Sequence, residues 1–190
     1  MKFYLAVFSI AVAVSAFAGG RNRSAPEPSP SPSATAYPRP SSSPVTGPLI
    51  GFSFASGTEK ERALLAQAQI KANETLHSKC FEDFMLKWGL IQTEGKTAAQ
   101  VVAHLRQVRL TVPVHYYYKN NSTVGYRRPP YPDVYFNRRF HTFYDACETA
   151  ANAVHEWSHV VGYDHPSNRT STRGRTVPYA INSAHEKCCR

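Results

Sequence analysis

The sequence predicts an α+β fold, because helical and strand-like patterns follow one another along a single domain-sized stretch. Apolar residues recur at helical spacing in residues 58–76, 97–108 and 143–161. Between the last two of these, residues 110–119 and 133–140 are rich in β-branched and aromatic side chains. A chain of 190 residues has room for one ordinary domain. We therefore expect one domain in which strands and helices pack together.

The first 48 residues are predicted to lie outside this domain. Residues 1–18 combine a lysine, an apolar run and Ala16-Phe17-Ala18, which is the pattern of a cleaved secretory signal peptide. The alternative is a membrane anchor. Residues 19–48 are rich in proline and serine and predict a disordered linker. The domain would then span residues 49–190, and no other segment is apolar enough to cross a bilayer. We expect a secreted or periplasmic protein.

Two capping boxes mark helix starts in the first half of the domain. Thr58 and Glu61 have the required spacing, and Thr97 and Gln100 repeat it. Between them, Cys80–Leu90 predicts a short helix. These segments are the N-terminal helices of the expected fold.

The two strand-like stretches follow. Leu110–Lys119 predicts a strand, and Pro113 places it at a sheet edge or makes that residue a strand start, because proline lacks a backbone donor. Asn120–Pro132 is rich in turn residues. Asp133–Phe140 predicts the next strand.

The last predicted helix covers residues 143–161. One apolar stripe follows it at intervals of three and four, formed by Cys147, Ala150, Val154, Trp157 and Val161. His155 and His159 lie off that stripe on a face of their own. Gly162 ends the helix, because glycine readily adopts a left-handed backbone.

Four cysteines, Cys80, Cys147, Cys188 and Cys189, predict two disulfides in an exported chain. A bond between the two neighbouring cysteines would be strained. We expect one bond from the C-terminus to Cys147 and one to Cys80. Zinc binding by the last two cysteines with His185 is a weaker alternative.

The net charge of +9 limits the classes of partner. A basic surface suits contact with an anionic cell surface, or it simply keeps a secreted protein soluble. The arginines are spread over loops and form no specific nucleic-acid motif. We expect a monomer.

The segment His155-Glu156-Trp157-Ser158-His159 carries the chemistry. Histidines four apart on a helix lie one turn above each other, so both imidazoles can reach one metal ion. Glu156 lies about 100° round the helix, where its carboxylate can take a proton from a water activated by that metal. The turn at Gly162 can bring His165 round as a third ligand and leave the fourth position open, which is the arrangement of catalytic Zn²⁺.

The full segment His155–His165, with the pattern HExxHxxGxxH, resembles the zinc signature of the metzincin metalloendopeptidases. The resemblance implies a zincin-like fold, with a twisted sheet over the active-site helix and a short C-terminal lobe. It implies zinc binding by His155, His159 and His165 and general base and acid catalysis by Glu156. It also implies that an edge strand binds extended substrate, for which Val112–Lys119 is our candidate.

One departure from that family concerns the methionine turn beneath the zinc. Methionine occurs only at positions 1 and 85, so Arg175–Tyr179 is the candidate for this turn. Val177 would replace the methionine, and Tyr179 would take the position of a tyrosine that binds metal or steadies an oxyanion in some metzincins; a buried structural role for Tyr179 is equally open. Asp164 is the alternative to His165 as third ligand, or it orients a ligand histidine.

These observations predict a secreted zinc-dependent endopeptidase that acts on protein or peptide substrates. A first alternative is a secreted binding protein in which zinc only stabilises the fold, although such a site has no use for Glu156. A second is a hydrolase of cell-wall peptides, which the basic charge would suit.

Overall fold

The computed structural model describes residues 50–167 and 170–189. The predicted signal peptide and the linker lie outside these residues. The described part contains one four-stranded sheet and six α-helices, which confirms the α+β prediction. The strands are Ile50–Ser56 (β1), Leu110–Tyr117 (β2), Gly125–Arg127 (β3) and Val134–Asn137 (β4). The helices are Glu59–His77 (α1), Lys79–Lys87 (α2), Ala98–Gln107 (α3), Arg138–His141 (α4), Ala146–Val160 (α5), Val177–Cys188 (α6) and the short 3-10 helix Arg173–Arg175 (η1).

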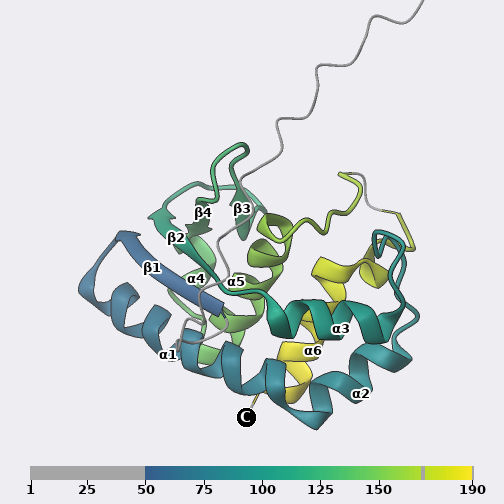
Figure 1. The fold of residues 1–190 in the computed structure, drawn as a ribbon. Helices are drawn as coiled ribbons and strands as arrows, with labels where there is room; N and C mark the ends of the chain where they lie inside the picture. The colour runs from purple at the N-terminus through teal and green to yellow at the C-terminus, as the bar shows by residue number, and fades with distance from the viewer. Residues whose placement is uncertain (1–49, 168–169, 190) are drawn as a thin grey trace, which may run out of the picture. The chain divides into compact units, whose positions relative to one another are not determined.

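The sheet has the order β1-β2-β4-β3. β1, β2 and β4 are parallel neighbours, and β3 pairs antiparallel with β4 at the edge. In Figure 1 the sheet lies beside α5, and α6 lies on the other side of that helix. α5 also packs against α1, so its residues 149–158 are buried on nearly every side. The predicted apolar stripe is therefore only one of several buried faces.

The edge-strand prediction for Val112–Lys119 is wrong. Most of this segment belongs to β2, which lies between β1 and β4. Pro113 fits there because β4 pairs with β2 only from Val114 onward, so the proline has a strand partner on one side alone. The edge strand next to α5 is β3, which lies in the stretch predicted to be only turns.

The helix starts follow local hydrogen bonds. Both predicted capping boxes are present, at α1 and at α3. The helix predicted from residue 143 begins instead at Ala146, because Asp145 and Glu148 form a third capping box there. The strand predicted to reach residue 140 ends at Asn137, whose side chain caps α4. β1 and α6 were not predicted.

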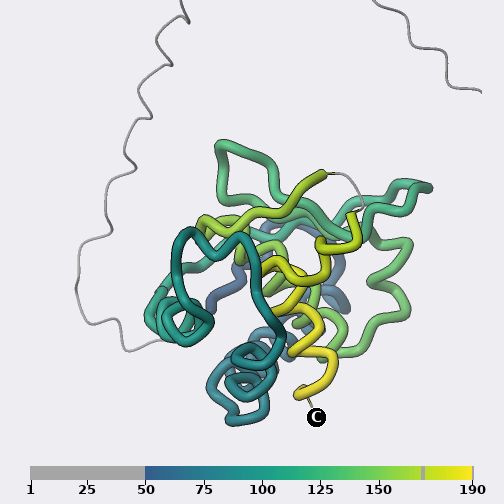
Figure 2. Tube along the Cα trace, turned by 90° about the vertical axis from the view of Figure 1, so that its right-hand side faces the viewer, coloured from purple at the N-terminus to yellow at the C-terminus, as the bar shows by residue number. Residues whose placement is uncertain are grey.

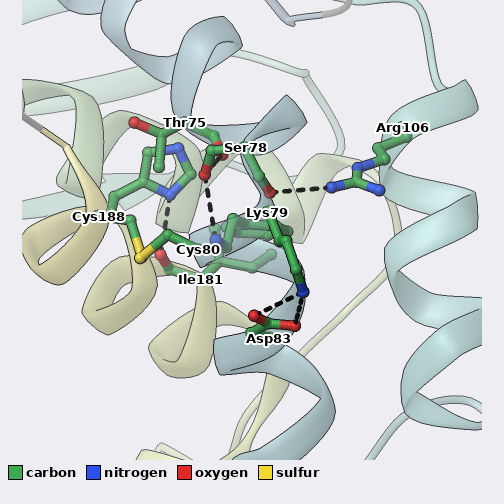
Figure 3. Close-up of a disulfide and its surroundings, with 10 residues drawn as sticks. Thr75, Ser78, Lys79, Cys80, Asp83, Arg106, Ile181 and Cys188 are labelled. Atoms are coloured by element: carbon green, nitrogen blue, oxygen red, sulfur yellow. Dashed lines mark hydrogen bonds and ion pairs between the residues drawn. A yellow bond between two sulfur atoms is a disulfide. The ribbon is translucent and has the colours of Figure 1, made fainter.

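Two disulfides fix the C-terminal end of α6. Cys188 bonds Cys80 at the start of α2, and Cys189 bonds Cys147 in the first turn of α5. Figure 3 shows the first bond between the two helices, close to the Ser78 cap of α2. This pairing confirms the expected connections and excludes a zinc site that uses both cysteines.

The buried apolar residues of the described part form one core cluster, to which the sheet and the helices α1, α2, α3, α5 and α6 all contribute. Figure 2 shows α6, in yellow, beside the green α5 at the centre of this arrangement. Among the described residues, no helix is long and apolar enough to cross a membrane.

Candidate metal centre and cleft

The candidate site begins at the C-terminal end of α5, where a glycine turn redirects the chain. Gly162 has φ +105°, the conformation that the sequence predicted at this position. The Tyr163 N–H donates to the Ser158 carbonyl and the Gly162 N–H to the His159 carbonyl, which is a Schellman motif. The side chain of Tyr163 is buried, and its hydroxyl lies 2.8 Å from Nδ1 of His104. The turn is therefore anchored in the core and carries the chain on to residue 165.

Three histidines converge as a result. His155 and His159 lie one turn apart on α5, and His165 comes from the loop after the glycine turn. Each offers one ring nitrogen, and these three atoms all lie within 4.8 Å of one another. Nε2 of His155 and Nε2 of His165 are 3.3 Å apart. Two nitrogens that each lie 2.0–2.1 Å from a tetrahedral metal ion are about 3.3 Å apart, so this spacing fits a bound metal.

The other nitrogen of each ring faces a hydrogen-bond acceptor. Nδ1 of His159 lies 2.8 Å from the Tyr163 carbonyl and 3.0 Å from the Asp164 carboxylate. Nδ1 of His165 lies 3.1 Å from the Pro166 carbonyl. His155 bonds to the Pro178 backbone at the start of α6. Such bonds fix the tautomer, so that the facing nitrogens are the unprotonated ones that a metal requires.

The electrostatic environment keeps these rings neutral. Burial, followed by the other two histidines, lowers the pKa of His155 to about 3. Burial and His165 lower the pKa of His159, and burial lowers the pKa of His165. Metal binding requires neutral imidazole, so these histidines are in the protonation state for metal binding near neutral pH.

Glu156 lies in the same cleft and is only 5% exposed. Its carboxylate accepts a hydrogen bond from the Arg127 backbone N–H on β3. One carboxylate oxygen is so close to Gly125 that a Cβ added to that glycine would lie 3.3 Å from it. Burial raises the pKa of Glu156 to about 8, and the hydrogen bond from β3 opposes this shift. The acid is thus held between α5 and the edge strand.

Tyr179, in the first turn of α6, packs beside the histidines. Its ring centroid lies 4.7 Å from that of His155 and 4.9 Å from that of His165. Val177, the predicted substitute for the methionine, is fully buried in the first turn of the same helix. The segment predicted to form a methionine-like turn is therefore the end of η1 and the start of α6.

Asp164 contacts the cluster without joining it. Its carboxylate bonds the ring of His159, and 79% of its side chain is exposed. His165, and not Asp164, offers a nitrogen to the cluster. His141 is buried and bonds Asn152, and it is not among the described residues that line the cleft.

An open cleft of about 820 Å³ runs past these residues. Its lining includes the edge strand β3 with residues 122–124 before it, Pro129, Tyr144, α5, the loop after Gly162, Arg173 and α6. Sequence reasoning missed several of these residues, namely Gly125, Asn152 and Arg173. The position of Asn152 one turn before Glu156 on a helix was a usable signal, whereas Gly125 and Arg173 reach the cleft only through the tertiary fold.

Comparison of the chain with protein-family models, with curated proteins and with solved structures found no match.

Proposed function

We propose that this protein is a secreted zinc-dependent endopeptidase of the metzincin-like type. The observation that carries the proposal is the convergence of three imidazole nitrogens on one point in a cleft that Glu156 also lines. A purely structural metal site is usually closed by four protein ligands and lies away from a cleft. Here the described residues supply three histidines beside open space, which suits catalysis.

His155, His159 and His165 would hold the ion. Zinc is the metal that three histidines with one open position suit best in a hydrolase. When bound, it supplies Lewis acidity, which polarises a carbonyl and lowers the pKa of water.

The chain's own residues would then move the proton. Glu156 accepts a proton from the attacking water and delivers it to the leaving amine nitrogen when the peptide bond breaks. The buried position of this carboxyl group and its single bond from β3 leave it able to exchange a proton. Tyr179 packs on two of the histidines, which supports a positioning role for its ring.

The edge strand supports an extended peptide as substrate. β3 pairs with β4 on one side only, and Gly125, Tyr126 and Arg127 line the cleft. A peptide can add to such an edge through backbone hydrogen bonds, which places its carbonyl groups along the cleft. This role replaces the one predicted for Val112–Lys119.

Export agrees with the two disulfides, because such bonds persist in oxidising compartments. The signal peptide and linker predicted for residues 1–48 belong to the same proposal, as does a zincin-like fold for residues 49–190.

The test is hydrolysis of an unfolded protein by the zinc-loaded chain, measured beside Glu156→Gln and Glu59→Gln. Glu59 is an exposed residue in the first turn of α1 and is not among the described residues that line the cleft, so its variant makes the same substitution outside the site. We expect all three proteins to bind one zinc per chain and only Glu156→Gln to lose hydrolysis, by a factor of a thousand or more, on the order of what a general base contributes.

Zinc binding without hydrolysis of protein substrates by the wild type would contradict the endopeptidase. It would favour the non-catalytic binding protein, or the cell-wall hydrolase if purified wall peptides are cleaved instead.

A further inference from the structure

Arg173 is a cation beside the three histidines that the proposed proton transfers do not use. Its guanidinium carbon lies 4.8 Å above the centroid of the Tyr179 ring, and that ring packs on His155 and His165. Arg173 lines the same cleft as these histidines. Arg173 therefore lies within electrostatic reach of the metal position.

Most hydrogen-bond donors of this guanidinium are unused by the described residues. Nη1 makes one long bond, 3.4 Å, to the Ser167 carbonyl, and Nε is buried with no partner among them. Arg173 forms no ion pair with any described carboxylate. A guanidinium has five N–H donors, and leaving a buried charged donor without a partner costs free energy.

Arg127, the other arginine among the described residues of the cleft, also has a buried Nε with no partner among them, but its terminal nitrogen is better bonded. Its Nη1 donates to the His159 carbonyl at 2.9 Å, which ties β3 to the end of α5. Arg127 is thus engaged in holding the fold together, whereas Arg173 is held in place from one side, by stacking on a ring. A second cation next to a metal ion is repelled unless an anion lies between them.

We propose that Arg173 binds the anionic oxygen of the substrate at the metal centre. In the peptidase reaction this is the carbonyl oxygen of the bond being cleaved. As the water oxygen bonds to the carbonyl carbon, the π electrons of the C=O bond move onto the carbonyl oxygen. The proton lost by the water goes to Glu156. The guanidinium stabilises the negative charge until the C–N bond breaks and Glu156 returns the proton to the amine. The carboxylate product carries the same anionic oxygens.

This inference deepens the proposed function and rests on it, but its first test needs no hydrolysis. The protein is loaded with Co²⁺ in place of zinc, and its visible absorption is recorded while acetate is added as a stand-in for the carboxylate product. We expect Arg173→Gln to bind acetate about tenfold more weakly than the wild type, since a charge-assisted hydrogen bond is typically worth 1.5–3 kcal/mol. The acetate affinity of Arg173→Lys should lie between those of Arg173→Gln and the wild type, because lysine keeps the charge but lacks the planar guanidinium.

Arg128→Gln is the matched control. Arg128 is exposed on the loop after β3 and is not among the described residues that line the cleft. Its variant loses the same charge and should bind acetate like the wild type. Equal acetate affinity for Arg173→Gln and the wild type would overturn the inference.

Metal affinity separates this role from a structural one. Removing a positive charge near the metal should leave the Co²⁺ affinity of Arg173→Gln unchanged or raise it. A tenfold loss of Co²⁺ affinity would instead mean that Arg173 only supports Tyr179 and the histidines, and it would overturn the inference.

Hydrolysis gives the final readout where the wild type cleaves protein. Arg173→Gln should lower kcat about a hundredfold with little change in KM, the effect of removing one oxyanion donor. A rise in KM with unchanged kcat, seen only for peptides with a free C-terminal carboxylate and not for their amides, would assign Arg173 to a terminal carboxylate and overturn the oxyanion role. If the wild type cleaves nothing, the proposed function fails, while the acetate titration still decides whether Arg173 binds an anion.

Discussion

At the scale of single residues, the candidate site depends on what holds each histidine ring from behind. His165 and His155 bond backbone carbonyls, whereas His159 also bonds the carboxylate of Asp164. A carboxylate that accepts from a ligand imidazole raises the basicity of the ring and fixes its orientation. Asp164 is therefore better explained as the partner of His159 than as a ligand.

This explanation predicts a moderate loss of metal affinity in Asp164→Asn. The amide still accepts weakly, and the Tyr163 carbonyl still accepts from the same ring nitrogen, so we expect zinc to bind about tenfold more weakly, the low end for such a change. Competition with a chromophoric chelator measures it. Asp83→Asn is the control, because Asp83 lies on α2 and pairs with Lys79 there. This variant should bind zinc like the wild type. Loss of zinc binding altogether would make Asp164 a ligand.

At the scale of elements, the edge strand β3 and the helix α5 come into close contact at Gly125. A Cβ on Gly125 would lie 2.9 Å from Nδ2 of Asn152 and 3.3 Å from Oε1 of Glu156. The backbone of this glycine is not in the left-handed region, so the constraint is space alone. The glycine thus lets β3 and Glu156 share one side of the cleft.

We therefore expect Gly125→Ala to impair catalysis more than folding. The methyl group must displace the side chains of Asn152 and Glu156, and a misplacement on the order of 1 Å can cost up to a hundredfold in rate. Hydrolysis should fall at least tenfold while the midpoint of thermal unfolding changes by only a few degrees. Gly174→Ala, where an added Cβ meets open space, should leave the rate unchanged. Equal rates for both variants would mean that Glu156 does not act from this position.

A second prediction at this scale concerns the contact between α6 and α1. His185 is fully buried, with Nδ1 3.0 Å from the Ile181 carbonyl and Nε2 3.3 Å from the Ala72 carbonyl. Burial lowers its pKa to about 4, against an ordinary value of 6.5, although both carbonyl bonds oppose this. Between pH 6.5 and 4 the unfolded chain binds a proton here that the folded chain does not. The contribution of neutral His185 to the free energy of unfolding is therefore fully present above pH 6.5, and it is lost as the pH drops through this window.

The loss attributable to His185 is roughly 3 kcal/mol at pH 4. Urea unfolding at several pH values, with EDTA throughout so that metal release adds nothing, would measure it. His185→Gln should show a shallower fall than the wild type. Part of the slope should remain, because burial also lowers the pKa of His141 to about 4. Identical slopes in both proteins would refute the assignment.

At the scale of the whole molecule, the two disulfides join the last residues of α6 to segments far away in the sequence. Cys147–Cys189 closes a separation of 42 residues and Cys80–Cys188 one of 108. Because α6 carries Pro178 and Tyr179 against the histidines, these bonds also stabilise one wall of the cleft.

Replacing Cys147 and Cys189 together by serine should lower the free energy of unfolding by up to about 4 kcal/mol, from the chain entropy that the cross-link removes in the unfolded state. The paired replacement of Cys80 and Cys188 should cost up to about 5 kcal/mol, because its loop is longer. Urea unfolding of each double variant and of the wild type, all with their remaining disulfides oxidised, measures the two losses in free energy of unfolding. A loss below about 1 kcal/mol in either would show that the helices alone keep α6 in place.

The sequence by itself determined the local features of this protein. Capping residues at α1 and α3, the histidine spacing on α5 and the glycine turn at Gly162 each depend on neighbours within a few residues. Even the connection of the C-terminus to Cys147 and to Cys80 was accessible, because adjacent cysteines do not easily bond to each other, whereas the tertiary structure decided which of Cys188 and Cys189 bonds which. These features predicted the three histidines that meet in the structure.

Only the tertiary structure decided which strand lies at the edge and what surrounds the histidines. The order of strands follows from long-range pairing, which local patterning does not encode, so β2 looked like an edge strand because of Pro113, and β3 looked like a turn. Gly125 is far from Glu156 in sequence, whereas Arg173 follows His165 by only eight residues, and both reach the cleft through packing. A charge or a space created by packing between distant segments leaves no periodic signal in the chain.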